Sequence, residues 1–307
     1  MRVLSLFDGM SCGRIALDRV GIPVTEYHAC EIDKYAIQVS KANHPDIIHH
    51  GSVVDYSPDY EVDLLIGGSP CQGFSFAGKQ LNFDDPRSKL FFEFVRILKE
   101  RNPKYFMLEN VEMRKEYEDV ISASLGVQPI RINSSLVSAQ NRERLYWTNI
   151  PDVEQPIDKN IKLIDILEDI EMIGPGAIRG RYLNKATILG RRLNSEGKRE
   201  DYNKDIPITQ CLEVRATNRD KSNCLTTVAK DSVLTPLPIG RHPDAFKKNL
   251  PFRYYTTKEY CRLQTVPEDY FGGVVSENQA KKMLGNGWTV DVIAHILGGI
   301  HEARKPD

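Results

Sequence analysis

The sequence predicts an α/β fold in which a doubly wound, mostly parallel sheet carries an inserted smaller domain. Strand-like apolar runs alternate with helix-like segments over residues 1–150, and such alternation implies right-handed crossovers in a parallel sheet. The alternation is lost over residues 151–250, and helical spacing returns in residues 251–307. We therefore expect three segments, in which the last returns to pack beside the first strand and both chain ends build the larger lobe.

Each expected strand is a short apolar run bounded by polar or turn-forming residues, and each expected helix has apolar residues at three- and four-residue spacing. The expected strands are residues 3–7, 27–32, 47–48, 62–66 and 105–108, with another after residue 144. The expected helices are residues 15–20, 34–43, 90–98, 277–284 and 290–300. Gly21 suits the end of the first helix because glycine readily adopts the left-handed conformation found there.

Composition limits the class of protein. The chain has 307 residues, 41% of them hydrophobic, and a net charge of −1, so nucleic-acid binding would need a local basic surface. No apolar run approaches the 18 residues of a membrane span, and the apolar start is too short for a secretory signal. Its six cysteines form no C-x-x-C pair, which predicts a reduced cytoplasmic protein without structural metal.

A cysteine follows the expected strand 62–66. Cys71 lies in the motif GGSPCQGFS, residues 67–75, at the strand edge where open α/β sheets bind ligands. Pro70 fixes its own φ and restricts Ser69, so we expect Cys71 on a stiff corner. Taken alone, Cys71 is also consistent with a small buried hydrophobic residue, as most free cysteines are.

The first strand is followed by a glycine-containing turn, FDGMSCG, residues 7–13. Glu31 ends the next expected strand, about 20 residues further on. A backbone that passes close at the glycines and a carboxylate that accepts ribose hydroxyls would suit an adenosine ligand. The turn lacks the full G-x-G-x-x-G spacing, so a dinucleotide is not favoured, and an ordinary tight turn remains an alternative.

Charged residues follow two further strands. Glu109 ends the strand 105–108, on the same edge as Cys71; a lone glutamate there is usually solvated, but beside a cysteine it is a candidate acid. Arg142 and Arg144 share one face of a strand because they are two residues apart. They are either a solvated face or a cationic wall that binds phosphate and substrate and favours a nearby thiolate.

The order of these motifs resembles that of the cytosine-C5 DNA methyltransferases, and it covers nearly the whole chain outside about residues 151–250. Some details look closer to the eukaryotic de novo branch, whereas QGFS and RLQ are of the bacterial type. The matching pieces are FDGMSCG, Glu31, SPCQGFS, LFFEFVRIL, ENV, QNRER, then EYCRLQ at residues 259–264 with Pro267, and GNGW at residues 285–288.

This resemblance implies a Rossmann-like methyltransferase fold and a covalent reaction on a cytosine flipped out of duplex DNA. Cys71 would add as thiolate to C6, and C5 would then take the methyl group of S-adenosylmethionine. Glu109 would bind N3 and the exocyclic amine. Arg142 would hold O2, and Arg144 would steady the nucleophile loop or a phosphate. The loop of residues 72–89 would close as a lid.

The resemblance also implies S-adenosylmethionine as cofactor, released as S-adenosylhomocysteine, and no metal. Phe7 to Met10 would surround the methionine part, Glu31 the ribose and Ile32 the adenine. The family usually has aspartate at Ser52, and a hydroxyl accepts a hydrogen bond without charge assistance, so we expect weaker binding. The expected cofactor residues are Phe7, Asp8, Gly9, Met10, Ser11, Cys12, Glu31, Ile32, Ser52, Val53, Pro70, Leu90, Asn286 and Trp288.

Residues 151–250 occupy the place of the family's target-recognition domain, between a catalytic and cofactor-binding segment (1–150) and a returning C-terminal segment (251–307). Residues 178–204 carry eight lysines and arginines against three acids, which suits phosphate contact or merely a solvated insertion. The expected partners are double-stranded DNA and a restriction endonuclease, with no membrane. The expected location is the cytoplasm, at the nucleoid in a bacterium or phage infection.

Two other functions stay open. The first is methylation of transfer RNA by an enzyme of the same superfamily, although the long recognition segment and Gln72–Gly73 favour DNA. The second is a catalytically silent DNA-binding paralogue, against which Cys71, Glu109 and Arg142 argue. Adenine-N6 methylation is disfavoured because the SPCQ loop lacks the polar-Pro-Pro-aromatic motif.

Overall fold

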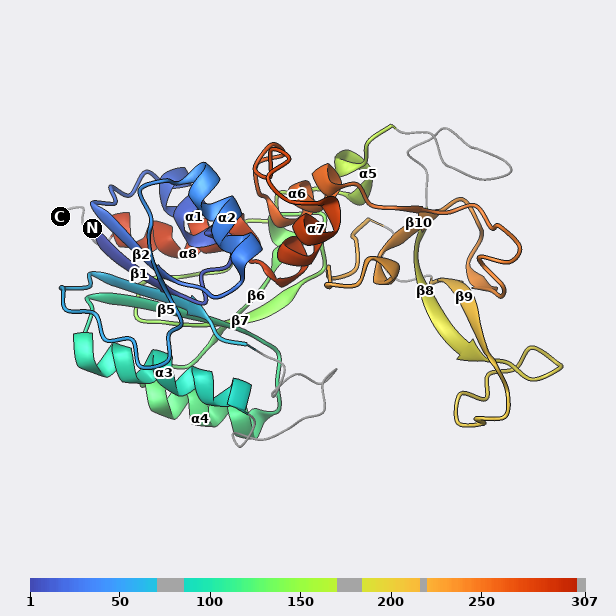
Figure 1. Cartoon of the computed structure of the whole chain (residues 1–307), viewed down its shortest axis with the longest axis horizontal. Coiled ribbons are helices and arrows are strands. Elements are labelled where there is room, and N and C mark those ends of the chain that lie inside the picture. The colour runs from blue at the N-terminus through green and yellow to red at the C-terminus, as the bar shows by residue number, and fades with distance from the viewer. Residues whose placement is uncertain (71–85, 170–183, 216–219, 303–307) are drawn as a thin grey trace.

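The computed structural model describes residues 1–70, 86–169, 184–215 and 220–302. It has a larger α/β lobe and a smaller lobe built on a second sheet (Figure 1). The predicted α/β class with a mostly parallel sheet is confirmed. In the described residues, no helix is both long and apolar enough to span a membrane.

The main sheet has seven strands in the described residues, in the order β3-β2-β1-β4-β5-β7-β6. The first five are parallel, and β7 is antiparallel to both β5 and β6. The order reverses between β1 and β4, and ligands bind at such a switch point in open α/β sheets. The strands are β1 (Arg2–Leu6), β2 (Glu26–Cys30), β3 (Ile48–Gly51), β4 (Leu64–Gly68), β5 (Tyr105–Val111), β6 (Ile130–Asn133) and β7 (Glu143–Thr148).

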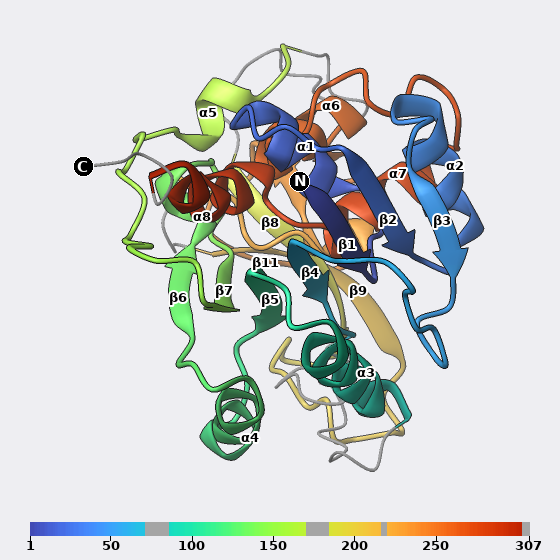
Figure 2. The same ribbon diagram turned by 90° about the vertical axis from the view of Figure 1, so that its left-hand side faces the viewer.

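Helices cover both faces of this sheet (Figure 2). On one face lie α1 (Cys12–Arg19), α2 (Lys34–Asn43) and α8 (Val290–Glu302), and on the other α3 (Pro86–Arg101) and α4 (Lys115–Leu125). Alternation along β1 separates the two cores, since Val3 packs with α1 and α8 whereas Leu4 packs with α3 and α4. Because α8 packs against α1, both ends of the described chain contribute to the larger lobe.

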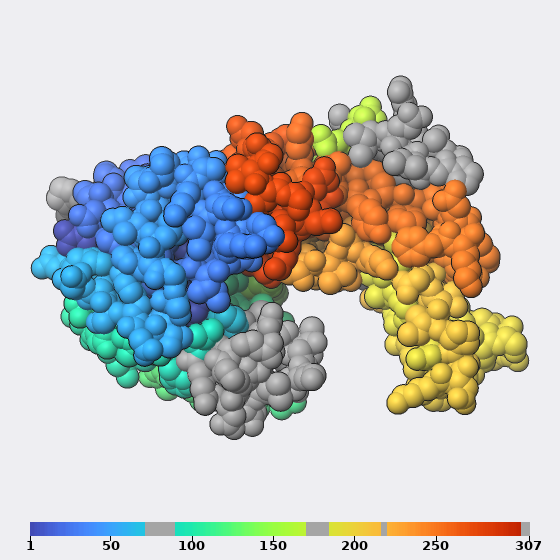
Figure 3. Space-filling view, viewed as in Figure 1, coloured from blue at the N-terminus to red at the C-terminus, as the bar shows by residue number. Residues whose placement is uncertain are grey.

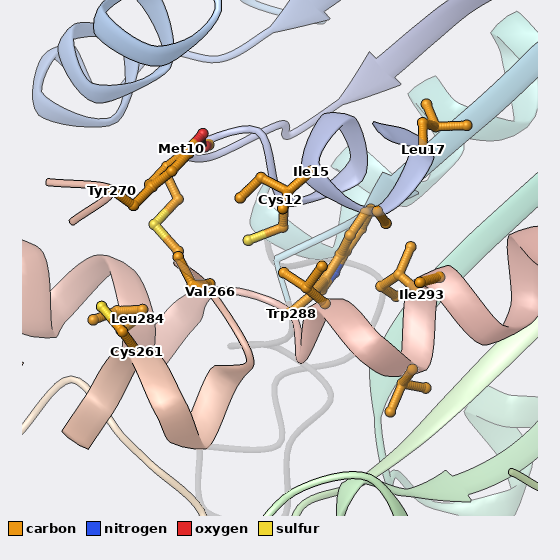
Figure 4. Packing of buried hydrophobic residues seen from close by; sticks show 14 of the residues in the cluster. Met10, Cys12, Ile15, Leu17, Cys261, Val266, Tyr270, Leu284, Trp288 and Ile293 are labelled. Atoms are coloured by element: carbon orange, nitrogen blue, oxygen red, sulfur yellow. Dashed lines mark hydrogen bonds between the residues drawn. The ribbon is translucent and has the colours of Figure 1, made fainter. Parts of the chain in front are cut away.

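The described part of the chain has three more helices: α5 (Leu163–Ile166), α6 (Thr257–Gln264) and α7 (Glu277–Asn286). It also has single 3-10 turns at Ser134–Leu136 and Ala229–Asp231. A capping box starts α6, in which Thr256 and Glu259 each accept a backbone N–H of the other. Figure 4 shows how Met10, Cys12 and Ile15 from the first turn and α1 meet Tyr270, Trp288 and Ile293 from the C-terminal part.

The second sheet is antiparallel, in the order β11-β9-β8-β10-β12. Ala186, Ile188 and Leu212 pack on one of its faces. Figure 3 shows the β8–β9 hairpin standing away from the larger lobe, with an open hollow between them. The strands are β8 (Asn184–Arg192), β9 (Ile208–Val214), β10 (Val233–Thr235), β11 (Gly240–His242) and β12 (Arg253–Tyr254).

Candidate functional site

A cavity of about 340 Å³ opens at the switch point of the main sheet, beside the carboxyl ends of β1, β4 and β5. This volume is in the range of small-molecule sites. It brings together most of the predicted site residues in the described chain. Those that line it are Phe7, Asp8, Gly9, Met10, Cys12, Glu31, Pro70, Glu109, Arg142, Arg144, Asn286 and Trp288.

The turn between β1 and α1 forms one wall of the cavity. Phe7, Gly9 and Ser11 have left-handed φ values of 58°, 59° and 66°, so three alternate residues of the turn adopt a conformation that only glycine adopts without strain. The backbone N–H of Gly9 donates to Glu31 Oε2 at 2.7 Å. The two elements that the sequence predicted for one ligand are therefore joined directly.

The carboxylate of Glu31 is well fixed. Its Oε1 accepts the backbone N–H groups of Ile32 at 2.7 Å and Asp33 at 2.8 Å, in addition to the Gly9 bond at Oε2. A carboxylate has about four lone-pair positions, so acceptor capacity remains on this cavity-lining group. That capacity suits a ligand hydroxyl.

A second carboxylate lies deeper in the same wall. Asp8 accepts hydrogen bonds from Ser11 Oγ at 2.5 Å and from the Tyr27 hydroxyl at 2.8 Å. Burial raises the pKa of Asp8 to about 6, although these hydrogen bonds oppose the shift. Asp8 is thus an anion at neutral pH and becomes protonated as the pH falls through about 6.

Glu109 lies at the opposite wall, at the end of β5. Arg144 Nε is 3.1 Å from Glu109 Oε1, and Trp288 Nε1 donates to Glu109 Oε2 at 3.1 Å. Gly68 permits this approach, because a Cβ there would lie 2.8 Å from Trp288 Nε1 and 3.1 Å from Glu109 Oε2. The two donors fix the orientation of a buried carboxylate.

The two predicted arginines differ in their surroundings. The buried guanidinium of Arg142 donates to the carbonyls of Gly287 at 2.9 Å, Leu225 at 3.2 Å and Gly285 at 3.4 Å. The guanidinium of Arg144 instead pairs with Glu109. Arg142 therefore braces the backbone around the cavity, while Arg144 supplies positive charge at the predicted acid.

Sequence reasoning missed several residues of the site, and two of them make side-chain contacts that matter for its geometry. Asn110 Nδ2 donates to Ser69 Oγ at 3.1 Å, which ties the end of β5 to the residues before Cys71. Cys224 Sγ lies 3.2 Å from Arg142 Nη1. The position of Asn110 directly after Glu109 was an available signal, whereas Cys224 comes from the irregular part of the chain and had none.

Other predicted residues lie outside the cavity lining. Ser11 lies behind Asp8. Val53 is buried in the core on the α3 side of the sheet, and Leu90, on α3 itself, packs against that core. Ile32 is 77% exposed, and Ser52 Oγ accepts the N–H of Val54 at 3.1 Å. The pairing of Cys30 with Gly51 nevertheless places Ile32 and Ser52 just beyond neighbouring strand ends.

The predicted nucleophile Cys71 and residues 72–85 of the predicted lid lie outside the described residues. The predicted lid boundary at residue 89 is wrong, because α3 begins at Pro86. Proline is favoured at the first position of a helix, where its missing N–H leaves no hydrogen bond unmade.

The second sheet carries a separate charged cluster. The buried Glu213 accepts from Arg191 Nε at 2.9 Å, from Arg241 Nε at 3.2 Å and from Arg215 Nη2 at 3.3 Å. Lys185 shares a face of β8 with Arg191 and reaches the Lys221 carbonyl at 2.9 Å. Burial opposes ionisation of Glu213, but the arginines outweigh it and lower its pKa to about 2, so Glu213 is an anion. Asp201 also pairs with Arg191, and the three arginines still exceed these two carboxylates in charge.

Comparison with known proteins decides the family. A family model described as C-5 cytosine-specific DNA methylase matches residues 1–302. The chain belongs to this family. The family that the motifs predicted is thereby confirmed. The protein is a DNA (cytosine-5) methyltransferase that depends on S-adenosylmethionine.

Relatives of this methyltransferase agree over most of its length. The Type II methyltransferase M1.ScrFI of Lactococcus lactis subsp. cremoris is 31% identical, with 96% of this chain and 76% of the relative covered. The Type II methyltransferase M.NlaX of Neisseria lactamica is 30% identical, with 96% and 94% covered. In both cases the alignment extends over nearly the whole of this chain.

Among solved structures, the Entamoeba histolytica methyltransferase EhMeth superposes with a TM-score of 0.69 at 16% identity, covering 100% of this chain and 99% of that one. A mutant form of Spodoptera frugiperda DNMT2 gives a TM-score of 0.65 at 21% identity, covering 98% of this chain and 99% of that one. At these identities the likeness establishes the fold of the methyltransferase and nothing more.

The cavity of the methyltransferase fits S-adenosylmethionine on its own chemistry. It combines a hydroxyl-accepting carboxylate at a strand end (Glu31), a second anionic carboxylate for an amino group (Asp8) and an aromatic wall (Trp288). The glycine-containing turn before α1 lets a ligand approach the backbone closely. These are the groups that a nucleoside joined to an amino acid requires.

Proposed function

We propose that the methyltransferase modifies a cytosine flipped out of duplex DNA through a covalent bond between Cys71 and C6. The observation that carries this proposal is that Glu109, at the cavity wall, is held by an ion pair with Arg144 and a hydrogen bond from Trp288. The cavity is also lined by Ser69 and Pro70, and Cys71 is the next residue in the sequence. An oriented acid at such a wall suits activation of a bound pyrimidine.

In the proposed reaction, the Cys71 thiolate forms a bond to C6, and the C5–C6 π electrons move toward C5 and the N3–O2 side of the ring. Glu109 holds a proton at N3, which neutralises the charge that develops there. Arg144 stabilises charge at O2. C5 receives the methyl group, loses its proton to base, and the S–C6 bond then breaks to restore the ring and the thiolate.

We assign O2 to Arg144 rather than to Arg142, which changes the expectation from the resemblance. Three backbone carbonyls already occupy the Arg142 guanidinium. Arg144 is paired with Glu109 and lines the same cavity, so one cation and one carboxylate can meet adjacent atoms of the base. Arg142 then acts by holding Gly285 and Gly287 in place.

S-adenosylmethionine, when bound, supplies the electrophilic methyl group. We propose that Glu31 holds its ribose and that the Phe7–Met10 turn with Asp8 holds its methionine part. Trp288 and Asn286 close the pocket, and Ile32 with Ser52 faces the adenine. These assignments follow the cavity lining and the positions of the strand ends.

We further propose that duplex DNA lies in the hollow between the lobes, against the face of the second sheet that carries Arg191 on β8 and Arg241 on β11. The three arginines around Glu213 exceed in charge the two carboxylates that pair with them, Glu213 and Asp201, and arginines bind phosphates and guanine edges. The residues 151–250 would serve as the recognition domain. The kinship with Type II methyltransferases supports a partner restriction endonuclease and action in the cytoplasm, at the nucleoid of a bacterial host.

The test uses duplex DNA that contains 5-fluorocytosine, incubated with S-adenosylmethionine and then denatured. Fluorine at C5 blocks elimination, so a covalent protein–DNA adduct should accumulate and should be absent in Cys71→Ser. Cys261→Ala, at a core position in α6, is the matched control and should form the adduct. Methyl transfer to transfer RNA without any DNA adduct would instead support the RNA enzyme, and transfer to neither would support the silent paralogue.

A further inference from the structure

One segment of the inserted region is built into the larger lobe. Lys221 is buried, and its ammonium donates to the carbonyls of Ser135 at 2.6 Å, Ile161 at 2.6 Å and Ser138 at 3.1 Å. The adjacent Ser222 extends the contact by backbone hydrogen bonds with residues 139 and 141. Residues 221–225, which we call the docked segment, are therefore anchored beside the start of β7.

The docked segment reaches the arginines of the site. The N–H of Leu225 donates to Gln140 Oε1 at 2.8 Å, and its carbonyl accepts from Arg142. Cys224 Sγ lies 3.2 Å from Arg142 Nη1 and 3.7 Å from Arg144 Nη2. One sulfur atom thus contacts both guanidinium groups.

The contact with Cys224 is one of three that the Arg144 guanidinium makes with described residues. Among the described residues, the guanidinium contacts Glu109 through Nε, the neighbouring Glu143 carbonyl through Nη1 at 2.7 Å and Cys224 through Nη2. The Glu143 contact is local to its own strand. Glu109 and Cys224 are therefore the two distant groups that set the direction of the guanidinium plane.

The charge of the site favours Cys224 as an acceptor. Burial opposes its ionisation, but Arg142 and Arg144 outweigh burial and lower the pKa of the Cys224 thiol. The other cysteines in the described residues have raised pKa values, mainly through burial; these are Cys12, Cys30, Cys211 and Cys261.

We propose that Cys224 is a positioning residue for the methyl-transfer reaction: by accepting from Nη2, its sulfur holds the Arg144 guanidinium in the plane in which Nε pairs with Glu109, beside the proposed position of the base. This inference rests on the proposed role of Arg144. It also means that the inserted region contributes to chemistry, because the docked segment completes the cation–carboxylate pair.

The test compares Cys224→Ala and Cys224→Ser with Cys261→Ala. We expect Cys224→Ala to lower kcat roughly tenfold, with the KM for DNA and the Kd for S-adenosylmethionine within about twofold of wild type. Cys224→Ser should stand closer to wild type because its hydroxyl can still accept from Arg144. Cys261→Ala should retain the wild-type kcat, which controls for loss of a thiol.

The rate of adduct formation on 5-fluorocytosine DNA separates this inference from the proposed function. If wild type forms the adduct and Cys224→Ala forms it at the same rate, Cys224 is not a positioning residue although the proposed function stands. A parallel rise in both binding constants, or a serine variant as slow as alanine, would likewise overturn the inference. Absence of the adduct in wild type would refute the proposed function itself.

Discussion

Glu109 and Trp288 are 179 positions apart in the sequence, yet the indole N–H of Trp288 donates to Glu109 Oε2 at 3.1 Å. With Arg144 on the other oxygen, each carboxylate oxygen has its own donor. The orientation of the proposed acid is therefore determined by β7 on one side and by the residues before α8 on the other.

We expect Trp288→Phe to lower kcat by about tenfold, because a hydrogen bond to a charged group contributes roughly 1.5–3 kcal/mol. Phenylalanine keeps much of the aromatic packing but removes the donor. Steady-state kinetics with saturating DNA and S-adenosylmethionine measure the effect. A variant with unchanged kcat would show that the Trp288 bond does not orient Glu109 during the reaction.

Asp8 predicts a pH dependence of stability. Its pKa is raised from 3.8 to about 6 by burial, so the folded state favours the protonated form. This contribution is fully present below pH 3.8, is lost as the pH rises through 6, and is worth roughly 3 kcal/mol at most. We therefore compare the free energy of unfolding of Asp8→Asn with that of wild type, by urea unfolding without ligand. The difference, variant minus wild type, should be more favourable to the variant at about pH 8 than at about pH 4. An equal difference at both pH values would contradict the raised pKa.

Binding should respond to Asp8 in the opposite sense. If the ionised carboxylate binds the amino group of S-adenosylmethionine, the Kd should rise as the pH falls below about 6. Asp8→Asn should bind more weakly at neutral and alkaline pH and lose this pH dependence. Isothermal titration calorimetry at about pH 5, 6.5 and 8 tests both points.

Ser52 predicts a gain of cofactor affinity. Its hydroxyl accepts the N–H of Val54, and an aspartate can keep that bond with one oxygen and offer the other to the adenine amine. We expect Ser52→Asp to lower the Kd for S-adenosylmethionine roughly threefold to tenfold, through a charge-assisted hydrogen bond. Ser57→Asp, at a nearby position in the sequence, controls for added charge; an equal or higher Kd in Ser52→Asp would refute the idea.

Arg241 predicts the DNA-facing side of the recognition sheet. Arg241 is on β11, pairs with Glu213 on the neighbouring strand β9, and remains partly exposed. Arg241→Ala should weaken duplex binding and reduce the slope of log K against log salt by about one, as expected for one lost phosphate contact. Arg96→Ala, on α3 of the larger lobe, should leave the slope unchanged. Equal slopes in wild type and Arg241→Ala would place the DNA elsewhere.

The sequence was sufficient for the parts of the site that depend on local order. Strand periodicity located the carboxyl ends of β1, β2, β4 and β5 to within three residues. Polar residues near these ends meet at the cavity, as Glu31 just after β2 and Glu109 near the end of β5 do. A parallel sheet aligns these ends whatever the details of packing.

Local order could not distinguish Arg142 from Arg144. Their different partners arise from the backbone of residues 225, 285 and 287, which reaches them through long-range packing. Cys224 was missed for the same reason, since its place depends on the anchor at Lys221. The start of α3 at Pro86 was placed too late because polar residues at the start of a helix resemble a loop.

The contact between Glu109 and Trp288 has a consequence for biosynthesis. Trp288 is made 179 residues after Glu109, and α8, which packs against α1, follows it. A nascent chain that ends before Trp288 therefore carries Glu109 and Arg144 but lacks the donor to Glu109 Oε2. Full methyltransferase activity should therefore appear only after the segment that contains Trp288 and α8 has been made and has docked on the larger lobe.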